Sequence, residues 1–425
     1  MTHGFGTHIQ WHHDDAIKTA TEDCFERVQF AKDLTALLIQ KGTLSTVISI
    51  EADWGNGKTS IINLIKENIH ENHPNVVVID FAPWLFSFAS LEDLVRKFLC
   101  DLIMGLNILG CKSLTKLLKK YAGHYLTFPL QHSLKSLITS WISRKFGSPK
   151  VSIEALKKDI NKILAQNDKP IVVIIDDIDR LQPKEIKMLF QLIKSICNFT
   201  GINYLLAYAR TPVIQALSYN GIYDGDLYLE KIVQVVNFLP VISKFHLQKF
   251  LKKEIQKLFS LLNLQFRDYE KLRLSWLYHE RKIINLLAKP RDVHQLVNQL
   301  KLILPTTHNQ VNAADVIIHQ ILALKLPRVA ELIRNHPRCF VPAYEADSYS
   351  AQSLHEEYGS GEIKPHIYLL KSLGLPQIEY NNALHTLNVL FNFQQEEVSF
   401  HSEDLRVSHP NHLQKLLHPG SHIHN

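Results

Sequence analysis

The sequence predicts an α/β protein built on a parallel sheet with helices on both faces, followed by a helical C-terminal region. Three observations predict this fold. Short apolar runs alternate with amphipathic stretches between residues 22 and 240, a glycine-rich turn follows the first run, and a pair of aspartates follows the third. Beyond Pro240 the pattern turns helical. At 425 residues the chain is long enough for two or three compact units.

The composition is that of an ordinary globular protein, with 46% hydrophobic and 21% charged residues. The five cysteines are scattered and never form a CxxC pair, which argues for a reducing compartment and against a disulfide frame or a zinc site. The first residues lack the basic start and apolar core of a signal peptide. We therefore expect a cytoplasmic protein.

The N-terminal part begins with residues 1–21, which we expect to be a flexible leader without a metal site. Apolar residues at helical spacing predict an amphipathic helix over residues 23–40, which Gly42 ends. Residues 47–50 then read as a buried strand, and residues 60–70 as a helix with one apolar face.

The turn between that strand and helix carries the strongest local signal, the sequence ADWGNGKTS. Glycines let successive backbone N–H groups converge on a phosphate chain, Lys58 adds a positive charge, and the Thr59 hydroxyl is a magnesium ligand. The following helix directs its positive dipole end at the same anion. Ala52 occupies a position where the full pattern has glycine. The alternative is a chance match in a surface turn, which the buried strand before it and the apolar helix face after it disfavour.

The next elements continue the alternation of strands and helices. Residues 76–79 read as a second buried strand, and Ser90 begins a strong helix with Asp93 placed to cap it. The apolar run over residues 98–110 is too short to span a bilayer and contains Asp101 and Asn107.

The positive charge of the chain is concentrated in one segment, residues 111–150. We expect this basic segment to be part of a helical insert that spans about residues 100–150. It holds eight lysines and arginines and no acidic residue, so taking these eight from the net charge of +6 leaves −2 for the rest of the chain. Leucines and aromatic residues are interspersed among the charges. Such a stretch can lie on an anionic membrane surface or follow a nucleic-acid backbone, and it can equally be a solvated face over an ordinary helical core.

The second strong signal is the run over residues 171–180, IVVIIDDIDR, which follows a predicted helix over residues 152–164. Five branched apolar residues in succession predict a central parallel strand covered on both faces. Acids at the carboxyl end of such a strand lie where open α/β sheets bind ligands. Asp176 is placed to hold magnesium and Asp177 to polarise an attacking water. Alone, the pattern is also compatible with a strand end and a capped turn.

The remaining elements complete the predicted domains. A helix begins at Pro183, and residues 204–208 and 232–239 read as further strands, so a domain spans residues 22–240. Residues 241–341 are helical, with Pro290 and Arg291 at a helix start where an arginine can point towards a phosphate. Residues 342–425 form a poorly defined tail in which periodicity weakens.

Together these segments resemble the KAP family of P-loop NTPases, ATPases of the additional-strand class related to AAA+ and STAND proteins. The resemblance covers most of residues 22–335. It rests on DCFERVQFAKDL, DWGNGKTS, VVVIDFAPWLFS, IIDDIDRL, YLEKIVQVVNFLP and KPRDV, which occur in this order.

The resemblance implies that the protein binds ATP with Mg²⁺. Lys58 would contact the β and γ phosphates, Thr59 and Asp176 would hold the metal, and Asp177 would orient the attacking water. Arg180 and Arg291 would be phosphate-sensing or finger-like arginines, and residues 241–341 a lid and sensor region. The residues expected around the phosphates are Asp53, Trp54, Gly55, Asn56, Gly57, Lys58, Thr59 and Ser60.

Three functional hypotheses follow. The first is an ATPase whose hydrolysis drives a conformational switch, completed by assembly with another copy or a partner and acting in bacterial defence against phage or plasmids, as in relatives. The second is a scaffold that binds ATP and turns over little, because Ala209 and Arg210 stand where relatives have an aspartate before an arginine-like position. The third is a nucleic-acid-dependent ATPase. Members of the family commonly carry transmembrane helices where this chain has residues 111–150, so we expect peripheral association with the inner membrane instead.

Overall fold

The computed structural model describes residues 15–42, 44–85, 90–126, 152–219, 224–341, 364–393 and 405–419. The chain divides into two compact units, one spanning Ala16–Val241 and the other beginning at Ile242. We call the first the sheet unit and the second the helical unit.

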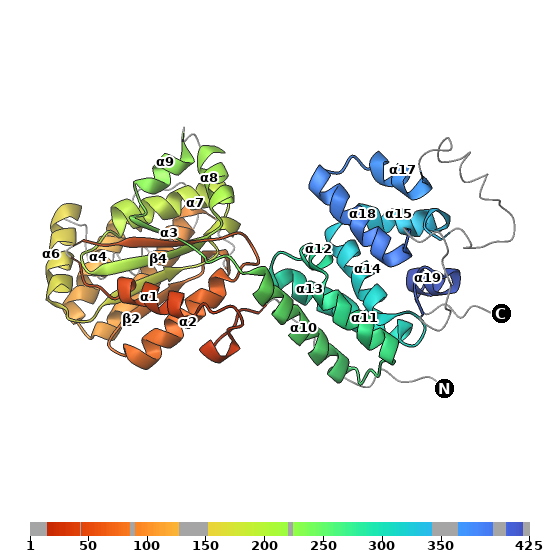
Figure 1. The fold of residues 1–425 in the computed structure, drawn as a ribbon. Coiled ribbons are helices and arrows are strands. Elements are labelled where there is room, and N and C mark those ends of the chain that lie inside the picture. The colour runs from red at the N-terminus through yellow and green to blue at the C-terminus, as the bar shows by residue number, and fades with distance from the viewer. Residues whose placement is uncertain are drawn as a thin grey trace. The chain divides into compact units, whose positions relative to one another are not determined.

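The sheet unit contains a five-stranded parallel sheet in the order β2-β3-β4-β1-β5, as far as the described residues show (Figure 1). The central strands are buried along their whole length, whereas the edge strand β2 alternates between buried and accessible residues, and every residue of the edge strand β5 is at least partly exposed. Strand β4 lies between β1 and β3, which confirms the predicted additional-strand fold. The strands are β1 (Val47–Glu51), β2 (Val77–Phe81), β3 (Ile171–Ile175), β4 (Ile202–Tyr208) and β5 (Val235–Phe238).

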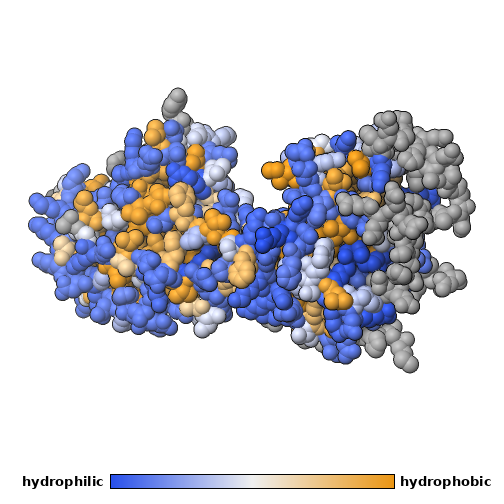
Figure 2. All heavy atoms as spheres, viewed as in Figure 1, coloured by the Kyte–Doolittle hydropathy of each residue, from blue (hydrophilic) through white to orange (hydrophobic). Residues whose placement is uncertain are grey.

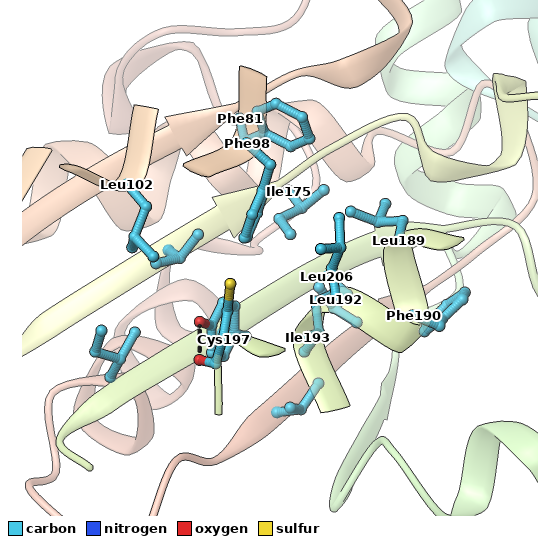
Figure 3. Packing of buried hydrophobic residues seen from close by; sticks show 14 of the residues in the cluster. Phe81, Phe98, Leu102, Ile175, Leu189, Phe190, Leu192, Ile193, Cys197 and Leu206 are labelled. Atoms are coloured by element: carbon cyan, nitrogen blue, oxygen red, sulfur yellow. Dashed lines mark hydrogen bonds between the residues drawn. The ribbon is translucent and has the colours of Figure 1, made fainter. Parts of the chain in front are cut away.

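Two apolar clusters cover the two faces of this sheet, because alternate residues of each strand point to opposite sides. On β3, Val173 and Ile175 belong to one cluster, and Val172 and Ile174 belong to the other. Figure 3 shows the larger cluster, where Phe81 of β2 meets Phe98 edge to face at 5.0 Å between ring centroids.

The helices that pack on the two faces differ in number. Over the smaller cluster lie α1 (Val28–Leu38) and α2 (Lys58–Asn72). Over the larger cluster lie α3 (Leu91–Leu106), α4 (Lys112–Leu126), α6 (Ile153–Gln166), α7 (Pro183–Gln191), α8 (Arg210–Tyr219) and α9 (Gly225–Glu230). The short helical turns of this unit are η1 (Ala20–Glu22), η2 (Pro83–Leu85), η3 (Asn107–Leu109), η4 (Ile178–Arg180) and η5 (Leu192–Ile196).

Several predicted boundaries change for identifiable reasons. Helix α1 begins at Val28 and not near residue 23, because the Asp23 carboxylate accepts the backbone N–H groups of Arg27 and Val28 at 2.6 and 3.1 Å and holds the chain outside the helix. Helix α3 starts after Ser90 as expected, and the Ser90 hydroxyl accepts the N–H of Asp93 at 3.3 Å. The predicted strand over residues 232–239 is shorter, at Val235–Phe238.

The N-terminal leader, which we expected to be flexible, is partly ordered. Residues 1–14 lie outside the described part of the chain, but the next residues are held against α2: Asn63 donates to the Ile17 carbonyl at 2.8 Å, and Ala20 donates to Glu67 at 2.7 Å. The expectation that the leader is flexible as far as residue 21 is therefore wrong for its last residues.

Of the basic segment, residues 112–126 form α4, and residues 127–151 lie outside the described part.

The helical unit contains α10 (Lys244–Leu261), α11 (Asp268–His279), α12 (Arg281–Ile284), α13 (Pro290–Thr307), α14 (Ala313–Lys325), α15 (Pro327–Asn335) and η6 (Pro337–Cys339). The expected poorly defined tail also contributes α17 (Pro365–Ser372), α18 (Gln377–Phe391) and α19 (Pro410–Leu417), so that prediction is wrong for residues 364–393 and 405–419.

A buried ion cluster holds this tail in place. Asp315 of α14 is fully buried and accepts hydrogen bonds from Arg273 of α11 at 2.6 Å and from Arg406 at 2.6 Å. Arg406 also donates to the Val389 carbonyl of α18 at 2.9 Å. These contacts join residues far apart in sequence, which is why the weak periodicity of the tail did not reveal them.

On the visible face of the molecule, apolar residues form small groups among hydrophilic ones (Figure 2). Among the residues that the structure describes, no helix is both long and apolar enough to cross a bilayer.

Candidate nucleotide-binding site

The glycine-rich turn lies between β1 and α2 and has a backbone that only glycine adopts readily at two places. Gly55 and Gly57 have φ values of 84° and 90°. Gly57 precedes α2 and offers no side chain to its first N–H groups, which are thus available to an anion. Ala52 does not have a positive φ. Alanine is therefore compatible with the backbone at the position where the pattern has glycine.

Lys58 is the first residue of α2, and its side chain folds back over the turn. It is only 7% exposed, and its Nζ donates to the Ala52 carbonyl at 2.8 Å. Burial lowers the pKa of Lys58, and the nearby carboxylates of Asp179, Asp176 and Asp177 oppose that shift. The ammonium group therefore lies among the acids that follow β3.

Thr59 and Asp176 are brought together across the turn. The Thr59 hydroxyl donates to Asp176 Oδ2 at 2.8 Å, and the other carboxylate oxygen accepts the N–H of Asp177 at 2.8 Å. Burial raises the pKa of Asp176, and the hydrogen bond from Thr59 opposes this. Two side-chain oxygens separated by 117 positions in the chain thus adjoin one another, because β1 and β3 end at the same edge of the sheet.

Asp177 has a strained backbone, with φ of 58°, just after the end of β3. Burial and the neighbouring Asp176 raise its pKa to about 6, while Arg180 acts in the opposite direction. The Nε of Arg180 lies 3.0 Å from Asp177 Oδ1. Arg180 is therefore engaged with the carboxylate of Asp177.

Aromatic residues connect the acidic segment to its surroundings. The Arg180 guanidinium lies over the Trp84 ring, 4.5 Å from its centroid. Trp54 is half exposed, and its indole N–H donates to the Asp179 carboxylate. Asp53 is exposed, whereas Asn56 and Ser60 are half-buried on either side of Gly57 and Lys58. The structure thus gathers the predicted residues 53–60, Asp176, Asp177 and Arg180 around one edge of the sheet.

Arg291 belongs to the helical unit, where it is the second residue of α13. The neighbouring Asp292 accepts the backbone N–H of Ala288 at 2.8 Å and orders the start of that helix. The approach of Arg291 to a phosphate stays a prediction.

An ion cluster at the ends of β1 and β4 was not revealed by the motifs. Glu51 is 2% exposed and accepts hydrogen bonds from the Tyr208 hydroxyl at 2.8 Å and from Arg210 at 2.8 and 3.0 Å. Arg210 also pairs with Asp226 of α9. The arginine at the end of β4 is therefore anchored directly beneath the start of the turn. A glutamate ending a buried strand was the signal in the sequence that could have indicated a buried partner.

The contacts of Arg27 were also not revealed by the motifs. It is 5% exposed and donates to the Asn56 carbonyl within the turn at 2.5 Å and to the Pro240 carbonyl at 2.6 Å.

The donors fit a magnesium ion that is shared with phosphates. The described residues contain no group of three or more His, Cys, Asp or Glu side chains placed to hold a metal by themselves. Magnesium in such sites takes one or two protein oxygens, and phosphates and waters complete its octahedron. The adjoining Thr59 hydroxyl and Asp176 carboxylate supply that number of ligands.

The chain is similar in sequence to a known protein. The phage T7 exclusion protein of Escherichia coli (strain K12) is 25% identical over 342 residues, which are 74% of this chain and 46% of that protein. This chain therefore spans about half the length of that relative.

Solved structures that match the chain include the Aeropyrum pernix ORC2 protein in its ADP form, with 14% identity, a TM-score of 0.37, and coverage of 86% of this chain and 93% of that one. Domain III of the Thermotoga maritima replication initiation protein DnaA gives 13% identity, a TM-score of 0.34, and coverage of 71% and 90%. The KAP family P-loop domain matches residues 27–307. The chain thus belongs to the KAP family of P-loop NTPases, as its motifs predicted.

Proposed function

We propose that this protein is a magnesium-dependent ATPase whose hydrolysis drives a conformational or assembly switch. The observation that carries this proposal is the contact between Thr59 and Asp176 at 2.8 Å, with Asp177 beside it. Phosphoryl transfer to water requires four parts that are present here: a turn whose N–H groups lack intrahelical partners, a lysine, a pair of metal-binding oxygens and a second carboxylate.

Each residue has a distinct role in this proposal. The N–H groups from Gly55 to Thr59 and the Lys58 ammonium bind the β and γ phosphates, and Lys58 leaves the Ala52 carbonyl to do so. Thr59 and Asp176 hold Mg²⁺, which neutralises charge that develops on the phosphate oxygens. Asp177 orients the attacking water. Its pKa of about 6 keeps it mostly ionised at neutral pH.

The helical unit acts as the lid and sensor region in this proposal, and Arg291 at the start of α13 senses the γ phosphate. Hydrolysis would then change the arrangement of the units, with a neighbouring subunit completing the site. The preference for adenine is inferred from the family.

The proposed biological setting is exclusion of phage or plasmids at the cytoplasmic face of the membrane. The name of the E. coli relative supports the first part. The second is supported by the positive charge of α4, whose lysines lie at positions 112, 116, 119 and 120, because such charges attract anionic lipid. The apolar residues Leu114, Leu118 and Tyr121 of the same helix pack in the larger cluster of the sheet unit, so the attraction is electrostatic.

A scaffold that binds ATP with little turnover is the second candidate, and the position of Arg210 favours it. Arg210 is engaged by Glu51 and Asp226 and does not present an unpaired group at the end of β4. Phosphate release by the purified full chain, measured alone, with anionic vesicles and with DNA, distinguishes the candidates. The ATPase predicts Mg-dependent release that Asp177→Asn abolishes while ATP stays bound, whereas the absence of turnover under every condition favours the scaffold. Release that requires DNA points to the nucleic-acid-dependent alternative.

Membrane association is tested by sedimentation with vesicles containing anionic lipid. Glutamate at positions 112, 116, 119 and 120 should abolish co-sedimentation. The matched control carries the same number of charge reversals on α10, at Lys244, Lys249, Lys252 and Lys253, which are all exposed. Equal binding by the wild type and the α4 variant would contradict membrane association.

A further inference from the structure

Arg27 connects two segments of the sheet unit that are remote in sequence. Its guanidinium Nη1 donates to the backbone carbonyl of Asn56, inside the glycine-rich turn, and its Nη2 donates to the carbonyl of Pro240, just after β5. The distances are 2.5 and 2.6 Å. Val241, the next residue, is the last of the sheet unit before the helical unit begins.

Burying the Arg27 guanidinium costs desolvation free energy, which packing with an apolar side chain would avoid. Burial lowers the pKa of Arg27 to about 10, and Asp23 opposes the shift. Both acceptors are neutral carbonyls, and apolar side chains of similar volume would fill the same space without desolvating a charge. The rigid guanidinium fork holds two separate nitrogen donors at a fixed spacing, so it can bond both carbonyls at once.

The turn is closely fitted to the arginine. A Cβ atom added to Gly57 would lie 3.2 Å from Arg27 Nη1. The φ of 90° favours glycine at position 57, and a side chain there would also press on the guanidinium and displace it by a few tenths of an ångström.

The chain after β5 is also attached to the other end of the same turn. The N–H of Leu239 donates to the carbonyl of Glu51, the last residue of β1, at 3.0 Å. Residues 239 and 240 therefore hold the turn at its start through a backbone hydrogen bond and near its end through Arg27. A displacement of the Asn56 peptide on binding an anion must either break the Arg27 hydrogen bond or move Pro240.

We propose that Arg27 is a positioning residue that transmits the nucleotide state of the glycine-rich turn to the junction with the helical unit. The proposal rests on the proposed function, because it requires that the turn binds a nucleotide. It assigns the coupling to one side chain whose guanidinium is bonded to the two backbone carbonyls and which has no role in the proposed binding of phosphate or metal.

The test is hydrogen–deuterium exchange of the full chain with and without Mg-ATP, following a peptide from the turn and a peptide covering residues 238–243. In the wild type, Mg-ATP should slow exchange in both peptides. Arg27→Lys keeps the charge but not the fork, so the turn should still be protected while the response at residues 238–243 falls at least about fivefold, within the usual range of coupling between two sites. Arg27→Gln should behave in the same way.

The matched control is Arg96→Lys, since Arg96 pairs with Asp93 on its own helix, α3, at 3.2 Å. It should leave both responses at the wild-type level. Thermal unfolding of each variant without nucleotide shows whether the fold is kept, and Arg27→Lys remains informative if Arg27→Gln unfolds.

Two outcomes separate this inference from the proposed function. If the wild type binds Mg-ATP and Arg27→Lys retains the full response at residues 238–243, the coupling through Arg27 is overturned and nucleotide binding stands. If the wild type shows no protection of the turn by Mg-ATP, both proposals are overturned. If Arg27 only contributes to packing, its variants should unfold at a lower temperature than the wild type, and Mg-ATP should still slow exchange in both peptides.

Discussion

Replacing Arg180 by glutamine should move the acid limb of the pH–rate profile towards higher pH. Asp177 must be ionised to orient and deprotonate water, so kcat/KM should rise with pH as this carboxyl loses its proton. Its pKa is raised to about 6 by burial and by Asp176, and the Arg180 guanidinium at 3.0 Å holds it from rising further. Removing the positive charge therefore favours the protonated, inactive form.

The size of the shift follows from the geometry. With a pKa of about 6, roughly a tenth of the wild-type sites are ionised at pH 5 and roughly nine tenths at pH 7. The Arg180 side chain is 40% exposed, so its attraction for Asp177 belongs at the solvent-screened end of the range, about 1 kcal/mol. This corresponds to slightly less than one pKa unit, which places the limb of Arg180→Gln at about pH 7.

The assay is ATPase activity between pH 5 and 9 at saturating magnesium, compared as kcat/KM for the wild type, Arg180→Gln and Arg180→Lys. The lysine variant keeps the charge and should shift the limb by less than half as much. Because the pKa of Asp176 is also raised, the limb belongs to the pair, and the displacement between variants is the quantity that tests the reasoning. If Arg180→Gln lowers kcat/KM by the same factor at every pH and leaves the limb in place, Arg180 acts on the phosphates as a finger-like arginine and this reasoning is refuted.

Four further outcomes are expected. Lys58→Ala should weaken Mg-ATP binding at least about tenfold in calorimetry through loss of a charged hydrogen bond, and an unchanged affinity would contradict its assignment. Thr59→Ala should remove the magnesium dependence of ATP affinity, whereas Thr59→Ser should keep it. Arg210→Met leaves Glu51 buried with only its hydroxyl donors, so urea denaturation should show a free energy of unfolding lower by about 2 kcal/mol, and a value like that of the wild type would count against a buried pair. Asp315→Asn removes the charge shared by two arginines and should lower the stability of the helical unit by about 3 kcal/mol, with retained stability arguing against the cluster.

Much of the fold could be predicted because its signals are local. The apolar run at residues 171–175 and the glycines of the turn constrain backbone conformation over a few positions, independent of what packs on them. The same applies to the start of α13 at Pro290. Helix α1 was misplaced at its start because the Asp23 carboxylate competes for the backbone N–H groups, which periodicity does not report.

The candidate site was predictable in part for the same reason. Lys58, Thr59, Asp176 and Asp177 could be named because each follows a strand end with a recognisable pattern. Their proximity could be expected from the rule that parallel strands end at one edge, and the 2.8 Å contact between Thr59 and Asp176 agrees with it. The partner of Arg180 was not predictable, because the sequence around Arg180 is the same whether its guanidinium contacts a phosphate or pairs with Asp177.

By itself the sequence determined the order of strands and helices, the family and the glycine-rich turn, because hydrophobic period and glycine conformation act between near neighbours. Only the tertiary structure decided which charged groups lie behind that turn. Arg27 meets Pro240 across 213 positions, and Arg210 meets Glu51 across 159. Such pairs depend on the register of β1 between β4 and β5, and that register arises from the packing of the whole sheet.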